Sequence, residues 1–163
     1  MFRLGSGHCR TSAKRTQTPI LRPMTFGRIN LRLGKPKIET IKILCDSGAS
    51  ATVISKQFVK TLKSKRDDVR IWTTPAGTFK THATCSIDFT MPEFHAKKLI
   101  QWKAHVTSQP MGYDMILGRD LLKELGIVLD FKNEAIIWDD VALPMKPLDA
   151  EAPELYPIPD GKV

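Results

Sequence analysis

Six short stretches in the middle of the chain limit its fold more than any other feature. Five of them alternate apolar and polar residues and one is an apolar run; they cover residues 25–34, 39–46, 81–91, 99–106, 126–131 and 135–140. Alternation with a period of two is typical of β-strands that bury one face. Many short strands of this kind indicate a small, closed β-domain.

Two segments break the strand pattern and predict short helices. In the first, residues 55–65, three apolar side chains share one helical face behind Ser55, a residue suited to cap a helix. In the second, residues 119–126, three leucines form an apolar stripe that ends at Gly126. Glycine is a common helix stop because it adopts the left-handed conformation without strain.

The two ends of the chain differ in charge. Of the 163 residues, which carry a net charge of +8, residues 1–45 hold ten Lys or Arg and one acid, whereas residues 139–163 hold six acids and two Lys. We predict a basic flexible tail (1–23), one domain (24–142) and a proline-rich, acidic tail or linker (143–163). The basic tail is either a solvated linker or an arm that binds nucleic acid. We expect no other part of the chain to bind nucleic acid.

Composition excludes several classes of protein. No stretch approaches the roughly 18 apolar residues of a membrane span, and the N-terminus lacks the apolar core of a secretory signal. We therefore expect an intracellular, cytoplasmic protein with no membrane partner. Three cysteines at unrelated spacings predict free thiols, with neither a disulfide framework nor a zinc site. The histidines show no metal-ligand spacing, and we expect no metal or other cofactor.

One acid, Asp46, follows the apolar run 43–45 and is predicted to end a buried strand. A carboxylate in such a place needs partners, because burying it unpaired is costly. Ser47 supplies a hydroxyl, and Gly48 permits a tight turn that brings an N–H group close to a carboxylate oxygen. Taken alone, these residues are either a functional acid or the turn after a strand.

The segments ILCDSGA (43–49) and ILGRDLL (116–122), in this order, resemble the paired motifs of the retropepsin-like aspartic proteases of LTR retrotransposons and retroviruses. The resemblance spans about residues 26–138. It implies an all-β fold: a closed acid-protease β-barrel with one or two short helices and one lobe per chain. It also implies an aspartic endopeptidase that processes a retrotransposon or retroviral polyprotein, in the cytoplasm and within virus-like particles.

The resemblance identifies Asp46 as the catalytic aspartate. Because the chain contains D-S-G once, the second acid must come from another copy, so the resemblance implies a homodimer that acts on a polypeptide substrate. Two adjacent carboxylates cannot both ionise, so one acts as base and the other as acid. The residues implied to support the site are Ser47, Gly48, Ala49, Ile116, Leu117, Gly118 and Arg119.

A glycine-bearing hairpin covers the site in this family, and the matching residues are Thr74, Pro75, Ala76, Gly77 and Thr78. The other interpretation is an ordinary surface hairpin. Retroviral members of the family pair the arginine of the second motif with an aspartate shortly after the first motif, and this chain has no acid there. Arg119 is therefore expected to pair with Asp120, Asp114 or a backbone carbonyl, or to lie in solvent at the helix start.

The main alternative function is a catalytically silent module with the same fold, used for dimerisation or protein binding. A nucleic-acid-binding β-barrel that uses the basic tail ranks behind it. Proteolysis of peptides separates the enzyme from both alternatives.

Overall fold

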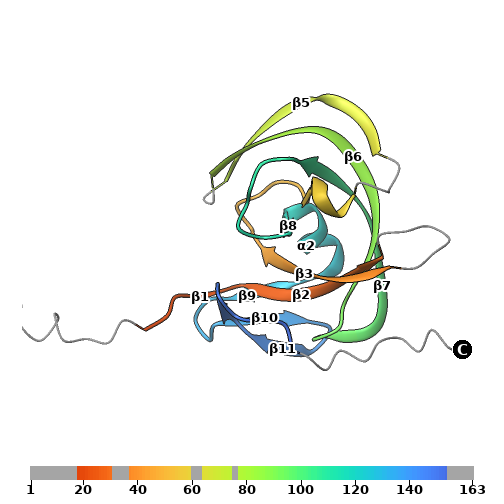
Figure 1. Cartoon of the computed structure of the whole chain (residues 1–163). Helices are drawn as coiled ribbons and strands as arrows, with labels where there is room; N and C mark the ends of the chain where they lie inside the picture. Colours follow the sequence, from red (N-terminus) through yellow and green to blue (C-terminus); the bar gives the residue numbers. More distant parts are fainter. Residues whose placement is uncertain (1–17, 31–36, 60–63, 75–76, 154–163) are drawn as a thin grey trace, which may run out of the picture.

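A computed structural model describes residues 18–30, 37–59, 64–74 and 77–153. Its elements, coloured along the chain in Figure 1, are β1 (Leu21–Arg22), β2 (Met24–Asn30), β3 (Ile38–Cys45), β4 (Val53–Ser55), the 3₁₀ turn η1 (Lys56–Phe58), β5 (Ser64–Thr74), β6 (Gly77–Met91), β7 (His95–Thr107), β8 (Met115–Leu117), α2 (Arg119–Leu125), β9 (Val128–Asp130), β10 (Ala135–Trp138), β11 (Val141–Pro144) and β12 (Lys146–Pro147). Strands dominate, as the alternating stretches predicted.

Six strands close into a barrel. The main sheet has the order β2-β3-β8-β4-β7-β6-β5, and a further pairing of β2 with β6 joins the two sides of the ring. The predicted closed, all-β barrel with a short helix is therefore confirmed. Strand β5 extends the sheet beyond the ring by pairing with β6, and Figure 1 shows these two long strands arching together over one end of the molecule.

The register of β3 and β8 brings the two sequence motifs together. These strands run parallel, with Ile43 opposite Met115 and Cys45 opposite Leu117. Strand β4 pairs with the other side of β8, so the chain that follows Asp46 returns to the same sheet. The motifs, far apart in sequence, therefore end at one place in the fold.

Ordered structure extends past the predicted domain limits of 24 and 142. Strand β1 pairs with β12, and β11 forms one edge of a second sheet with the order β11-β10-β9. Proline is tolerated at a sheet edge because its missing N–H is not needed there. Pro144 lies in the edge strand β11, and Met145 next to it is buried. Lys146 Nζ lies 3.0 Å from Glu93 Oε2, which ties this segment to the barrel.

The two predicted helices have different outcomes. Helix α2 is confirmed: it begins at Arg119 and ends before Gly126, whose φ is 72°. The helix predicted at residues 55–65 is wrong: among the described residues of this range, Lys56–Phe58 form a 3₁₀ turn and a strand begins at Ser64, while residues 60–63 lie outside the described part. The apolar side chains of Phe58 and Val59 still enter the core. Among the described residues, no helix is long and apolar enough to cross a membrane.

Candidate active site

Asp46 lies at the end of β3, in a turn that its own backbone and side chain help to form. Its N–H donates to the carbonyl of Leu117 at 2.9 Å, and its carbonyl accepts from the N–H of Ala49 at 3.2 Å. One carboxylate oxygen, Oδ1, accepts the Gly48 N–H at 2.8 Å. The residue is partly exposed. Asp46 is therefore held in a fixed position while part of its surface stays open to solvent.

Gly118 lets the two motif segments approach closely. A Cβ atom at this position would lie 2.4 Å from the carbonyl carbon and oxygen of Ala51, too close for any side chain. Two backbone donors bind the loop after Asp46: Gly118 N–H donates to Thr52 Oγ1 at 3.2 Å, and Arg119 N–H donates to the Ala49 carbonyl at 2.8 Å. The start of α2 is thus bonded directly to this loop.

Asp120 is the functional-site residue whose role the sequence did not predict. Its Oδ1 accepts the Thr52 hydroxyl at 2.8 Å, and its Oδ2 accepts the Thr52 N–H at 3.2 Å and the Trp102 indole N–H at 3.1 Å. Thr52 is fully buried. Asp120 therefore joins the helix, the loop after Asp46 and strand β7. An acid in the first helical turn was the only sequence signal for this role.

Arg119 does not make the predicted pairings within the described part of the chain. Its side chain is exposed and forms no hydrogen bond or ion pair with Asp120, Asp114 or a carbonyl there. Asp114 instead accepts the Lys42 N–H at 2.7 Å. Burial raises the pKa of the Asp114 carboxyl, although this hydrogen bond and the charge of Lys42 act in the opposite direction.

Arg119 and Ser47 line a hollow of about 570 Å³ beside the Asp46 turn, which we call the β9 hollow. Its other lining residues are mostly apolar and come from α2 and the segment through β9: Leu122, Lys123, Gly126, Ile127, Val128, Leu129 and Phe131. Val128 is 53% exposed and Phe131 is 63% exposed. The turn that holds Asp46 therefore borders an apolar surface that the described residues leave open.

The remaining support residues pack on two sides of the sheet. Leu117 is buried in the main core, whereas Ile116 and Ala49 belong to a separate apolar cluster on the opposite side. Cys45 is buried in the main core, and burial raises the pKa of its thiol to about 12, while the charge of Lys146 acts in the opposite direction. The neighbour of Asp46 is therefore an unreactive thiol.

The residues predicted to form the covering hairpin lie at the ends of β5 and β6, which pair with Thr73 opposite Thr78 and Thr74 opposite Gly77. Pro75 and Ala76, which would make the turn itself, lie outside the described residues.

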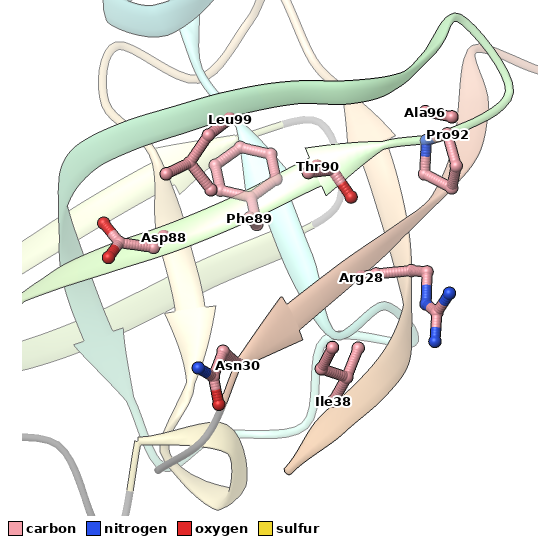
Figure 2. A pocket seen from close by; sticks show the side chains of 9 residues that line it. All are labelled: Arg28, Asn30, Ile38, Asp88, Phe89, Thr90, Pro92, Ala96 and Leu99. Carbon is pink, nitrogen blue, oxygen red and sulfur yellow. The ribbon is translucent and has the colours of Figure 1, made fainter. Parts of the chain in front are cut away.

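Another hollow, of about 240 Å³, lies on the barrel wall where β2 meets β6. Figure 2 shows its lining side chains, among them Arg28 on β2, Asp88 on β6 and Leu99 on β7. None of its residues belongs to either sequence motif.

Comparison with known proteins identifies the family of the chain and structures that are similar to it. Residues 36–124, more than half of the chain, match the family described as gag-polyprotein putative aspartyl protease, so the chain belongs to that family. The structure is similar to the retroviral protease-like domain of Ddi1 from Leishmania major, at 19% identity and a TM-score of 0.56, over 80% of this chain and 98% of that one. It also matches the EIAV protease in complex with the inhibitor HBY-793, at 22% identity and a TM-score of 0.48, over 72% of this chain and 100% of that one. A comparison with curated proteins found no match.

Proposed function

We propose that the chain is an aspartic endopeptidase that cleaves a polyprotein of the retroviral or retrotransposon type, with Asp46 as its catalytic residue. One observation carries the proposal: a partly exposed carboxylate is fixed at a strand end by the Gly48 N–H, at 2.8 Å. Membership of the gag-polyprotein aspartyl protease family supports both the chemistry and the substrate class.

Peptide hydrolysis by carboxyl groups needs one ionised and one protonated member. The ionised carboxylate takes a proton from water as the water oxygen bonds to the scissile carbonyl carbon, and the carbonyl oxygen takes the proton of the other carboxyl. A hydroxyl of the resulting gem-diol then gives its proton to the carboxylate that had donated one. The carbon–nitrogen bond breaks, and the carboxyl that had taken the proton of water protonates the leaving amine. Both carboxyl groups end as they began. Because the motif occurs once per chain, a second copy supplies the second acid.

The β9 hollow supports a homodimer with the site at its centre. Strand β9 pairs with β10 on one side only within the described residues, so its other edge offers unpaired backbone groups. The exposed side chains of Val128 and Phe131 lie on the same surface. Ser47 belongs both to the Asp46 turn and to this hollow, so a copy seated there reaches the catalytic turn. We therefore place the two-fold contact at β9.

The other residues of the site take supporting roles in this proposal. Gly118 and Ala49 set the close packing of the motif loops, and Ile116 and Leu117 form the wall beside Asp46. The hairpin of β5 and β6, from Thr74 to Thr78, would close over the substrate backbone and gate its entry.

Cleavage of a peptide library by the wild type and by Asp46→Asn tests the catalytic assignment. The wild type is expected to cleave and to be blocked by a pepstatin-type inhibitor, and Asp46→Asn to be inactive. The matched control is Asp88→Asn, an exposed acid on β6 that keeps full activity. Undiminished cleavage by Asp46→Asn would refute the assignment. A folded wild type that binds peptides without cutting them would favour the silent binding module instead.

Sedimentation of Val128→Lys tests the contact at β9. A lysine at the centre of an apolar contact is expected to shift the chain to monomers and to abolish cleavage with it. Leu99→Lys is the control, because Leu99 is similarly exposed, at 58%, but lines the other hollow. A Val128→Lys variant that dimerises like the wild type would show that the copies meet elsewhere.

A further inference from the structure

The sheet around Asp46 buries apolar side chains on both of its faces. Ile43, Cys45 and Leu117 point into the main core, whereas Leu44 and Ile116, their neighbours in sequence, point to the opposite face. We call this opposite side of the sheet, with the apolar cluster on it, the second face. The buried residues of the cluster are Met24, Phe26, Leu44, Ala49, Tyr113 and Ile116. Leu44 and Ala49 flank Asp46 in sequence. An apolar surface therefore leads up to the catalytic turn.

The chain's own C-terminal segment, residues 148–153, lies on this second face. Ala150 and Ala152 pack against the cluster and are partly buried, while Glu151 between them is exposed. Residues 148 and 149 form a turn, closed by the Ala150 N–H donating to the Pro147 carbonyl at 3.0 Å. The alternation from Ala150 to Ala152 that follows is that of an extended peptide, which places every second side chain on a surface. Lys42 Nζ donates to the carbonyl of Leu148 at 2.8 Å, which fixes the start of the segment.

We propose that residues 148–153 occupy in cis a peptide-binding face beside Asp46, and that an extended peptide with small apolar side chains at alternate positions displaces them. The inference rests on the proposed function, since Asp46 is what makes a peptide on this face a substrate. It adds a regulatory contact and a substrate class: the chain's own tail competes with peptides for the surface next to the catalytic turn.

The contacts suit a displaceable occupant. Two alanine methyl groups hold the segment, together with two hydrogen bonds, from Lys42 Nζ to the Leu148 carbonyl and from the Ala150 N–H to the Pro147 carbonyl at 3.0 Å. The segment itself forms no strand. The segment is nevertheless tethered directly after β12, so its local concentration on the face is high, on the order of millimolar. A competitor of this kind raises KM and leaves kcat unchanged, because it is absent once the substrate is bound.

The octapeptide KPLDAEAP, which copies residues 146–153, provides a probe of the face that does not depend on catalysis. The full chain carrying both Ala150→Glu and Ala152→Glu should release its own tail, because a carboxylate cannot be buried against an apolar cluster without cost. Backbone amide spectra should then show shifts at Leu44 and Ala49. Added octapeptide should reverse these shifts, with an affinity about tenfold higher for the double variant than for the wild type.

Glu151→Ala is the matched control, because Glu151 lies in the same segment but is exposed. It should bind the octapeptide as weakly as the wild type does. The amide spectra also report whether each variant is folded, and Ala152→Glu alone replaces the double variant if that chain unfolds. Absence of octapeptide-induced shifts at Leu44 and Ala49 in a folded variant, or equal binding by wild type and variant, would overturn the proposal and leave the segment a structural cover.

The outcome is separable from the proposed function. If the wild type cleaves no peptide but the octapeptide exchanges with the tail, the catalytic assignment fails and the binding face stands. If cleavage occurs, KM for a cleaved library peptide should fall about tenfold in the double variant with kcat unchanged. Cleavage with identical KM in both chains would refute the competing tail and leave the catalytic assignment intact.

Discussion

Replacing Asp120 by alanine tests whether this carboxylate holds the active-site loops together. Three groups from outside its own helix donate to it: the Thr52 N–H, the Thr52 hydroxyl and the Trp102 indole N–H. Thr52 is fully buried, so its N–H would be left without an acceptor in the variant. An unsatisfied buried donor costs about 1 to 3 kcal/mol, and each lost bond to a charged group costs a similar amount. Two of the three donors belong to Thr52, so the losses do not add in full. We therefore expect Asp120→Ala to lower the free energy of unfolding by about 3 to 4 kcal/mol, near the low end of the sum of the three bonds.

Urea unfolding followed by circular dichroism measures this loss, at one fixed chain concentration so that dimerisation contributes equally to every variant. Trp102→Phe removes one donor and leaves the other bonds intact, so it should cost about 1 kcal/mol. Asp88→Ala, which removes an exposed acid, should stay within about 0.5 kcal/mol of the wild type. An Asp120→Ala chain as stable as Asp88→Ala would refute the reasoning. Peptide cleavage should fall with Asp120→Ala, because the loop after Asp46 loses its anchor.

Three further perturbations follow from the geometry. Gly118→Ala should destabilise the fold by about 1 to 3 kcal/mol or prevent folding, since the added Cβ meets the Ala51 backbone at 2.4 Å; an unchanged urea midpoint would contradict this. Because the pKa of Asp114 is raised, the folded state binds more protons than the unfolded state at pH values just above the ordinary pKa of 3.8, so the free energy of unfolding falls as the pH rises through this range. Asp114→Asn should flatten the dependence of the free energy of unfolding on pH in this range, and an unaltered dependence would refute the reasoning. Cys45, with a pKa of about 12, should resist thiol reagents in the folded chain and react after unfolding, as peptide mass mapping would show; modification in the folded chain would contradict its burial.

The barrel could be predicted because its strands carry a local signal. Alternating residues mark β2, β3, β6 and β7, and register follows once one face is buried. The segment after Ser55 carried a helical signal instead, and tertiary pairing overrode it, because Ser64 begins a strand that pairs with β6. The C-terminal prolines suggested a tail, yet edge strands accept them, and Pro144 and Pro147 both lie in strands.

Only those residues of the candidate site that lie close together in the sequence could be predicted. Asp46, Gly48 and Gly118 stand in short motifs, and local chemistry explains each of them. The partners of Asp120 lie 68 positions before it at Thr52 and 18 positions before it at Trp102, so no local pattern joins them. The packing of Ala150 on the second face likewise arises from the fold rather than from a sequence signal.

Mixing wild-type chains with Asp46→Asn chains is the most direct test of the central claim, that two copies of Asp46 form one site. The two chains are unfolded together in equal amounts and refolded, so that dimers form at random. Peptide cleavage by the mixture is then compared with cleavage by a pure wild-type sample that has the same total chain concentration. A site built from two copies predicts about one quarter of the wild-type activity, because only pairs of intact chains cleave. Activity of about one half, proportional to the intact chains, would show that each chain acts alone and would contradict the account.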